Sequence, residues 1–297
     1  MKTRTFGRTG LGVTELGYGA MELRRMDEAE AGGLLNAVLN SGINFIDTAP
    51  DYGLSEELIG KTIPHRRDEY ILASKCGCNI PRDADDDVGH IWTQEKVFHN
   101  VDLSLKRMKT DHLDLLQVHS GSAAEIVQGE VVEALKKVQE QGKVRFIGYT
   151  ATGQRRFGIE DMPEMLAWDA FDFYQLPYCV VARTHENTIT DLKCRDLGTI
   201  LRGTVKPWYC RVYDDKGEWE VLWEQANLDD LMSENEDRYR FMLRFAISHP
   251  NYSTVIIGTK NPDHLRANVQ TVTDGPLPDD VYTEAKRRLD AFGMTAG

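Results

Sequence analysis

Apolar and polar positions follow two alternating periods along the chain. Short apolar runs typical of buried strands recur at residues 15–21, 43–48, 69–75, 112–119, 144–150, 171–178, 197–203 and 253–259. Segments with helical periodicity lie between and after them, at residues 28–42, 55–63, 93–109, 125–143, 185–196, 235–248 and 262–270. Ser55 is expected to cap the second of these helices. Apolar strands that alternate with helices indicate parallel pairing with the helices outside.

The number of strand–helix units favours a (β/α)8 TIM barrel, an α/β fold of about 250 residues. The alternative is a doubly wound sheet, which usually carries G-x-G-x-x-G in its first strand–helix turn. Here Gly17 and Gly19 are followed by Glu22 where the third glycine should stand. No repeat or linker marks a boundary, so we expect residues 1–297 to form a single barrel domain.

Charge and composition narrow the function classes. The chain has 297 residues, 41% of them hydrophobic, and a formal net charge of −12. An acidic protein is not expected to bind nucleic acid or anionic membranes nonspecifically, because both need a basic field. No apolar run approaches the roughly 18 residues of a membrane span, and the first residues lack the apolar core of a secretory signal. We therefore expect a cytoplasmic protein with a small-molecule substrate.

The five cysteines are scattered and odd in number, which indicates reduced thiols. Cys76 and Cys78 form a Cys-Gly-Cys pair that resembles half of a metal site. A zinc site would need about two more ligands at a recognisable spacing. The neighbouring sequence offers none, so the sequence predicts no metal.

Polar residues stand where three successive expected strands end. Asp47, Lys75 and His119 occupy these ends, and Tyr52 lies in the loop just after Asp47. Each residue alone has an ordinary structural explanation, such as a turn or a helix cap. Together they would converge on one mouth of a barrel, where the chemistry of this fold occurs. Asp51 is left open, as a turn cap or a solvent-facing residue.

This combination suits a general acid beside an oxyanion site. A nearby lysine favours the phenolate and lowers the pKa of a tyrosine, and a paired carboxylate keeps that lysine charged. A neutral histidine can hydrogen-bond a carbonyl oxygen, so the group can protonate an alkoxide as it forms. Hydride addition to a carbonyl produces such an alkoxide. No side chain supplies hydride, which implies a nicotinamide cofactor.

Several segments resemble the aldo-keto reductase superfamily: "FIDTAPDYG…SEELIGKTI", "YILASKCG", "SLKRMKTDHLDLLQVH", "GKVRFIGYT" and "VIIGTKNPDHLRANV". They run from about residue 4 to residue 270 in the family's order. The resemblance implies a (β/α)8 barrel preceded by a short β-hairpin, which reduces carbonyls with NAD(P)H and has no Rossmann domain. The resemblance implies that Tyr52 is the general acid and that Lys75 and Asp47 adjust its acidity. It also implies that His119 orients the carbonyl.

The resemblance also implies an extended cofactor across the barrel mouth. Its expected contacts are Gly19, Ala20, Met21, Thr150, Gln175, Arg202, Gly258, Thr259, Lys260, His264 and Asn268. Two positions depart from the family pattern. Ala151 replaces an asparagine, so one bond to the nicotinamide carboxamide is lost, and Arg202 replaces a stacking aromatic residue. Cations at 260, 264 and 266 favour NADP (NADPH) over NAD, since a 2′-phosphate needs such partners.

The substrate class is less defined. Two long loops, 76–92 and 204–230, are expected to act as lids or binding walls. Trp92 is the candidate residue for a wall of the substrate pocket. Most aromatic residues of the second loop are expected instead to pack that loop against the rest of the protein. A small aldehyde, ketone or sugar carbonyl is expected. Two alternatives stay open: a lyase that uses Lys75 as a Schiff-base nucleophile, and a non-catalytic, cofactor-binding regulatory relative.

Overall fold

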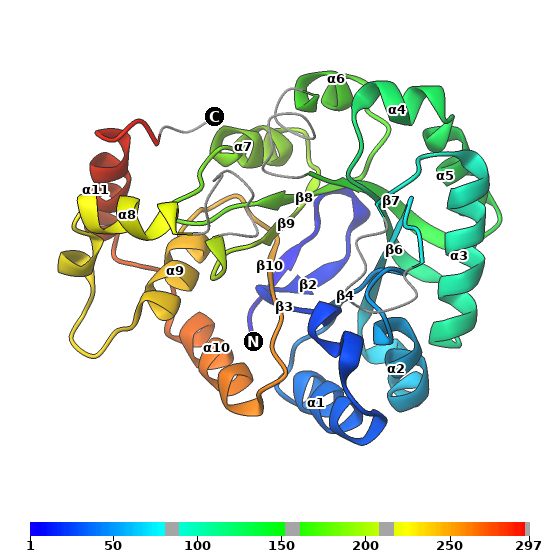
Figure 1. The fold of residues 1–297 in the computed structure, drawn as a ribbon, viewed down its shortest axis with the longest axis horizontal. Helices are drawn as coiled ribbons and strands as arrows, with labels where there is room; N and C mark the ends of the chain where they lie inside the picture. Colours follow the sequence, from blue (N-terminus) through cyan, green and yellow to red (C-terminus); the bar gives the residue numbers. More distant parts are fainter. Residues whose placement is uncertain (81–88, 152–160, 208–216, 295–297) are drawn as a thin grey trace.

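A closed barrel of eight parallel strands forms the centre of the molecule (Figure 1). The computed structural model describes residues 1–80, 89–151, 161–207 and 217–294. The barrel order is β10-β3-β4-β5-β6-β7-β8-β9. The strands are β3 (Leu16–Gly19), β4 (Phe45–Asp47), β5 (Ile71–Cys76), β6 (Leu113–His119), β7 (Val144–Thr150), β8 (Phe173–Pro177), β9 (Gly198–Arg202) and β10 (Thr254–Ile257). The predicted (β/α)8 barrel is confirmed, with all eight expected strands in their expected places.

A short antiparallel hairpin precedes the barrel and covers one of its ends. It consists of β1 (Thr3–Thr5) and β2 (Gly12–Thr14). Between these strands, the fully buried ring of Phe6 contacts Phe173, with ring centres 5.4 Å apart. A side chain at Gly198 would place its Cβ 2.7 Å from the Phe6 ring, so glycine is required there. The hairpin thus closes the amino-terminal end of the barrel and leaves chemistry to the other end.

Helices surround the barrel (Figure 1). They are α1 (Glu28–Asn40), α2 (Ser55–Thr62), α3 (Gln94–Met108), α4 (Ala123–Gln128), α5 (Val131–Glu140), α6 (Met162–Ala167), α7 (Glu186–Cys194), α8 (Glu218–Gln225), α9 (Arg238–Ile247), α10 (Pro262–Asp274) and α11 (Asp279–Asp290). In α3, the side chain of Thr93 accepts a hydrogen bond from the Lys96 amide and begins the helix. Val97, Val101 and Met108 recur at helical spacing and are buried, so this face packs against the strands.

Two of the predicted helices differ from the structure at their boundaries. The helix expected over 125–143 is divided into α4 and α5, because Glu130 adopts a left-handed conformation with φ of 50°. Ser55 is the first residue of α2, and Leu54 occupies the cap position. The Ser55 hydroxyl instead donates to the Ala20 carbonyl (2.9 Å) and shares a hydrogen bond with Thr48. This serine therefore ties α2 to the barrel rather than beginning the helix.

The long segment 204–230 contains a helix where a loop was expected. Residues 218–225 form α8, in which Trp219 and Trp223 are buried. The Trp223 indole donates to Asp229 (2.7 Å), which confirms a packing role for these two aromatic residues. Trp208, Tyr209 and Tyr213 lie outside the described residues. Within the described ranges, no helix is long and apolar enough to cross a membrane.

Candidate active site

A buried ion pair lies inside the carboxyl-terminal end of the barrel. Asp47 ends β4, and Lys75 lies in the adjacent strand β5. The Lys75 ammonium is 2.6 Å from Asp47 Oδ2, and both side chains are almost completely buried. The other carboxylate oxygen, Oδ1, accepts hydrogen bonds from Gln117 (2.7 Å) and Gln175 (3.0 Å). Asp47 is thus fully partnered, which is what a buried carboxylate needs in order to remain charged.

Lys75 is held as a cation. Burial is the largest single effect and acts to lower the pKa of Lys75. The charge and hydrogen bond of Asp47, together with the neighbouring Tyr52 and Asp51, outweigh it, so the pKa is raised above its usual value. The ammonium also donates to the Thr48 carbonyl oxygen (2.9 Å). With the amine protonated and bonded on two sides, it is a poor nucleophile and a good source of positive potential.

Tyr52 lies in the loop between β4 and α2, directly beside this cation. The Lys75 ammonium is 4.8 Å from the centre of the Tyr52 ring. The ring is half-buried, and burial raises the pKa of Tyr52 to about 12, although Lys75 acts in the opposite direction. The expected lowering by Lys75 is therefore present but smaller than the effect of burial. The phenol keeps its proton, as a general acid for carbonyl reduction must.

His119 completes the predicted set at the end of β6. Its ring meets the edge of the Tyr52 ring, with ring centres 6.0 Å apart and planes at 81°. Burial lowers the pKa of His119 well below its usual value, so the imidazole is neutral near pH 7. The structure thus brings Asp47, Tyr52, Lys75 and His119 together, as the sequence predicted.

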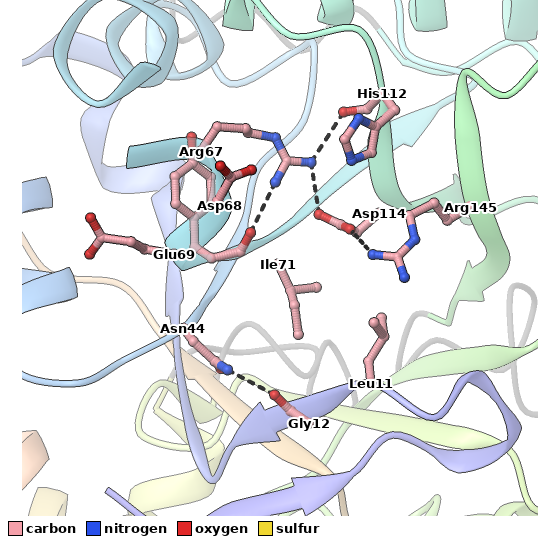
Figure 2. Close-up of a pocket in the computed structure, with 11 residues that line it drawn as sticks. Leu11, Gly12, Asn44, Arg67, Asp68, Glu69, Ile71, His112, Asp114 and Arg145 are labelled. Atoms are coloured by element: carbon pink, nitrogen blue, oxygen red, sulfur yellow. Dashed lines mark hydrogen bonds and ion pairs between the residues drawn. The ribbon is translucent and has the colours of Figure 1, made fainter. Parts of the chain in front are cut away.

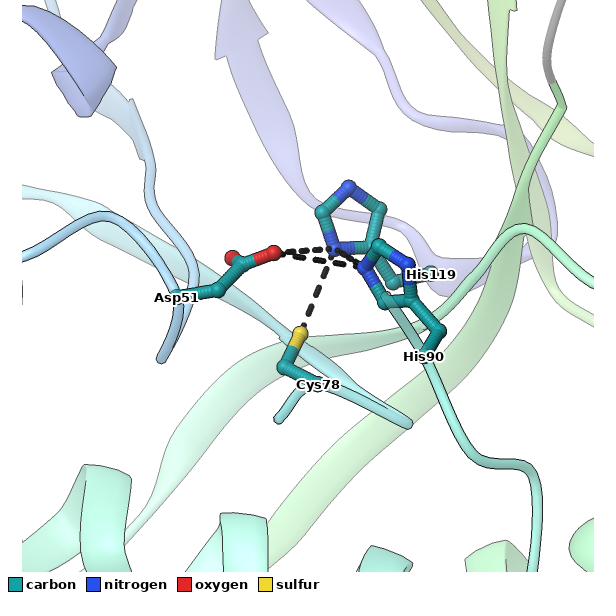
Figure 3. A group of neighbouring side chains, drawn as sticks. All are labelled: Asp51, Cys78, His90 and His119. Carbon is teal, nitrogen blue, oxygen red and sulfur yellow. Dashed lines mark hydrogen bonds and ion pairs between the residues drawn. The ribbon is translucent and has the colours of Figure 1, made fainter. Parts of the chain in front are cut away.

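Three further polar side chains surround Nδ1 of His119 (Figure 3). His90 Nε2 lies 2.9 Å away, Cys78 Sγ 3.2 Å and Asp51 Oδ2 3.4 Å. Burial raises the pKa of the Cys78 thiol well above its usual value, whereas the interactions of Asp51 with His119 and His90 overcome burial and lower the pKa of that carboxyl to about 2. For this convergence the sequence drew attention only to Cys78, through the Cys-Gly-Cys pair, because the four residues come from separate segments.

Trp92 lies against the same corner of the barrel mouth. Its indole donates to the His119 carbonyl oxygen (3.3 Å), and its ring stacks on His90 with ring centres 6.1 Å apart. A Cβ on Gly121 would be 2.7 Å from the indole, so glycine is needed for this close approach. Trp92 is half-buried beside His119, a position that a substrate-wall residue requires.

Gln117 is a site residue that the sequence analysis missed. It lies in β6, two residues before His119, and bonds the Asp47 carboxylate. Residues two apart on a strand share one face, so this pairing was readable once His119 was placed in the barrel. The Gln117 Oε1 atom is buried and has no hydrogen-bond partner among the described residues.

Most expected cofactor contacts lie in the last residues of barrel strands or just beyond them, and His264 and Asn268 lie on α10. The Gln175 side-chain amide donates one hydrogen bond to Asp47, and its oxygen accepts a hydrogen bond from the Thr150 hydroxyl (3.2 Å). An amide has two hydrogens and two acceptor positions, so one of each remains for a carboxamide. Arg202 donates to the Ala151 carbonyl oxygen (2.7 Å), which holds its guanidinium at the end of β7. These residues fit a nicotinamide ring.

The remaining expected contacts surround β3, β10 and the start of α10. Gly19 and Gly258 lie so close that a Cβ on Gly258 would be 2.7 Å from the Gly19 carbonyl oxygen. Lys260 and His264 are exposed at the beginning of α10, and Asn268 is half-buried one turn further. A helix beginning presents free amides to an anion. One feature was not expected: Arg266 is paired with Asp263 in the same first turns.

A cavity of about 350 Å³ lies at the opposite end of the barrel (Figure 2). It is lined by the hairpin and by the beginnings of β5, β6 and β7. Arg67 and Arg145 both bind Asp114 there, at 2.8 and 2.6 Å. The amino-terminal end of such barrels serves stability rather than catalysis, so we place the active site at the other end.

Comparison with known proteins agrees with this assignment. L-galactose dehydrogenase of Arabidopsis thaliana is 29% identical over 299 residues, covering 92% of this chain and 89% of the relative. NADH-specific methylglyoxal reductase of Escherichia coli (strain K12) is 27% identical over 210 residues, covering 67% of this chain and 63% of the relative. The holo form of aldo-keto reductase AKR11C1 from Bacillus halodurans superposes with a TM-score of 0.80 and 26% identity, covering 97% and 96% of the two chains.

The Aldo/keto reductase family model matches residues 15–289, nearly the whole chain. Proteins of this family bind nicotinamide cofactors and oxidise or reduce their substrates. The match spans all eight barrel strands and includes the corner where Asp47, Lys75, Tyr52 and His119 meet. The chain therefore belongs to the aldo/keto reductase family of oxidoreductases.

Proposed function

We propose that the protein interconverts a carbonyl and an alcohol by hydride transfer with NADPH, and that Tyr52 is the general acid and base. One observation carries the proposal: the buried Asp47–Lys75 pair lies directly beneath the Tyr52 ring, with the ammonium 4.8 Å from the ring centre. A fixed positive charge beside a protonated phenol supports proton donation, because the phenolate that results is stabilised.

The residues divide the work by position. His119 orients and polarises the carbonyl through a hydrogen bond to its oxygen, which requires a neutral ring with a proton on the nitrogen that faces the substrate. Tyr52 then donates its proton to that oxygen as negative charge develops on it. Lys75 stabilises the phenolate, and Asp47 keeps Lys75 charged and in place. The bound nicotinamide supplies the hydride.

NADPH is proposed over NADH on local charge. Lys260 and His264 stand exposed at the beginning of α10, where helix amides also favour an anion. The Arg266–Asp263 ion pair acts against this preference. Asp263 neutralises the charge of Arg266, and its carboxylate would repel a phosphate. One relative is named an NADH-specific reductase. Lys260 is thus the residue on which the proposed preference depends.

The lyase alternative requires a neutral, accessible Lys75. Its ammonium is buried, bonded to Asp47 and the Thr48 carbonyl oxygen, and has a raised pKa. These contacts favour the reductase proposal. The non-catalytic alternative is disfavoured by the presence of all four expected side chains in mutual contact range.

The proposal is tested by a substrate screen with deuterated NADPH. Aldehydes, ketones, aldoses and ketoses are offered, and NADPH oxidation and deuterium in the product are measured. We expect oxidation with at least one class, and one deuterium on the former carbonyl carbon. Borohydride trapping of a substrate on Lys75 without nicotinamide, in the absence of any deuterium transfer, would support the lyase instead.

We also propose that the reaction occurs in the cytoplasm and that residues 1–297 act as one domain. Cys76, Cys78 and Cys194 are free thiols, which suits a reducing compartment. Mass spectrometry of alkylated protein from the native cell would test this, since reduced cysteines should all carry the label.

A further inference from the structure

Four side chains of metal-ligand type converge at the barrel mouth. Asp51 follows β4, Cys78 follows β5, His119 ends β6, and His90 lies in the segment before α3. Figure 3 shows all four pointing toward one another. One donor atom from each lies within 4.8 Å of every other.

Hydrogen bonding does not account for this arrangement. An imidazole nitrogen has one position in the ring plane, for either a proton or a lone pair. Nδ1 of His119 nevertheless has three polar atoms around it, from His90, Cys78 and Asp51, at 2.9, 3.2 and 3.4 Å. His90 Nε2 also faces Asp51 Oδ2 at 3.2 Å. The four atoms therefore form one group in which contacts share atoms, and hydrogen bonds from Cys78 to His119 and from His90 to Asp51 would still leave the two imidazole nitrogens 2.9 Å apart.

Asp51 gives a second, independent observation. Its other oxygen, Oδ1, is buried and has no hydrogen-bond partner among the described residues. An ionised carboxylate that is buried with an unbonded oxygen is costly unless a cation balances it. A metal bound to the neighbouring oxygen would supply that charge.

Four of the six separations between the donor atoms are near those of a tetrahedral metal site, and the other two are at most 4.8 Å. Bonds of about 2.0 Å to nitrogen or oxygen and about 2.3 Å to sulfur give edges of about 3.3 to 3.7 Å between ligands. The four closest separations here, from 2.9 to 3.4 Å, are near those edges. Two imidazoles, a thiolate and a carboxylate form a borderline-soft set that suits Zn²⁺ and not Mg²⁺ or Ca²⁺.

We propose that Asp51, Cys78, His90 and His119 bind one Zn²⁺ ion. Binding would displace the Cys78 thiol proton to solvent, and the resulting thiolate and carboxylate would neutralise the ion's two charges. Four protein ligands leave no open position, so the site is structural rather than a Lewis-acid centre. Its role is to fasten the segment that carries His90 to three adjacent strand ends.

The backbone already holds two of the ligands in place. Cys78 and His90 face each other across an isolated antiparallel bridge. The side chain of Asn100, in α3, makes two hydrogen bonds to the Cys78 backbone. It accepts one from the Cys78 amide (2.9 Å) and donates one to the Cys78 carbonyl oxygen (3.1 Å). A site built in this way needs little reorganisation to bind a metal.

The metal would also orient His119, a consequence that rests on the proposed function. Coordination through Nδ1 obliges the ring to carry its proton on Nε2. That nitrogen can then donate to the carbonyl oxygen of a substrate. Metal binding itself does not depend on this step, so the two ideas can fail separately.

The test measures metal binding without substrate or cofactor. Full-length protein is stripped with a chelator, then titrated with Co²⁺, whose absorption reports tetrahedral geometry and a thiolate bond. Zn²⁺ content after desalting is measured by elemental analysis. We expect one equivalent per chain, a sulfur-to-cobalt band, and displacement of Co²⁺ by Zn²⁺.

Matched variants locate the site. Cys78→Ser and His90→Ala should each weaken Zn²⁺ binding at least tenfold, and Cys78→Ser should abolish the sulfur band. Cys194→Ser and His99→Ala change an exposed thiol and an exposed imidazole elsewhere and should bind as the wild type does. Circular dichroism would establish that each variant is folded, and Asp51→Asn provides a near-isosteric third ligand change.

Two results would overturn the proposal. One is a wild-type protein that takes up no stoichiometric Zn²⁺ or Co²⁺. The other is folded Cys78→Ser, His90→Ala and Asp51→Asn proteins that bind Zn²⁺ as tightly as the wild type. A failure of the carbonyl screen would leave these measurements unchanged.

Discussion

Asp47 and Asp114 are both buried carboxylates of the barrel, but they lie at opposite ends and have different partners. Asp114, near the beginning of β6, binds two arginines and accepts from the Leu72 amide (2.9 Å). Arg145 in this group is about half exposed, with 47% of its side chain accessible. Asp47 instead binds one fully buried lysine and two glutamine amides.

The difference shows how one kind of interaction serves two purposes. At the amino-terminal end, the charges satisfy one another and join the strand beginnings to the segment before β5. At the carboxyl-terminal end, the pair leaves the lysine facing Tyr52. Removal of the first group should therefore affect stability alone, whereas removal of the second should affect both stability and activity.

Lys75→Met should have the largest combined effect. It leaves the Asp47 carboxylate buried without its cation, at a cost of about 3–5 kcal/mol in the free energy of unfolding. Activity should fall roughly 10²- to 10⁴-fold, because the phenolate loses its stabilising charge. The double variant Asp47→Asn/Lys75→Met, with no buried charge, should recover stability but not activity, as denaturant unfolding and initial rates would show. Equal activity in wild type and Lys75→Met would break the comparison.

Asp114→Asn should lower stability by about 1–3 kcal/mol, since the arginines lose a charged acceptor, and should leave kcat unchanged. Burial acts to raise the pKa of Asp114, but Arg67 and the other partners lower it below its usual value. A depressed pKa gives stability that is present above about pH 4 and lost as the pH falls further. The free energy of unfolding of the variant should therefore fall less steeply than that of the wild type as the pH is lowered below about 4.

Asp68→Asn is the matched control for this change, because Asp68 is an exposed carboxylate that lines the same cavity. Urea unfolding between pH 3 and 7 should show no difference between Asp68→Asn and the wild type. A loss of kcat in Asp114→Asn would contradict the division between the two ends of the barrel.

Lys260→Ala should have the smallest effect and should concern the cofactor alone. Loss of a charge-assisted contact to the 2′-phosphate should weaken NADPH binding about tenfold, with NADH binding unchanged. Fluorescence titration of both cofactors measures this. The same loss for both cofactors would show that Lys260 acts on the shared part of the molecule, and no loss for either would remove the proposed basis of the preference.

Much of the fold was predictable from the sequence, because barrel strands are short apolar runs between amphipathic helices. The strand at 144–150 was predicted with the bounds that the structure has. The boundary between α4 and α5 was not, since the left-handed Glu130 leaves no mark in the apolar pattern. The helices α6, α8 and α11 were also missed; α11 has a strongly polar sequence in which only a few apolar residues, such as Ala285 and Leu289, are buried at helical spacing.

Candidate site residues could be predicted where a polar residue directly ends an apolar strand. They could not be predicted where side chains from several separate segments must come together. Asp47, Lys75 and His119 were found because each follows an apolar strand. The group of side chains around His119 was not found, since an isolated β-bridge and hydrogen bonds with Asn100 of α3 bring Cys78 and His90 together. The expectation of no metal considered only residues near Cys78 in sequence, whereas the fold brings side chains that could bind a metal together from other segments.

The most direct test of the account is the rate of carbonyl reduction by Tyr52→Phe at saturating NADPH and substrate. The change removes one hydroxyl beside Lys75 and leaves the ion pair intact. We expect kcat to fall roughly 10²-fold or more, with an unchanged Kd for NADPH. Tyr239→Phe, an exposed tyrosine on α9, should retain full activity. A Tyr52→Phe protein that reduces its substrate at the wild-type rate would contradict the central claim.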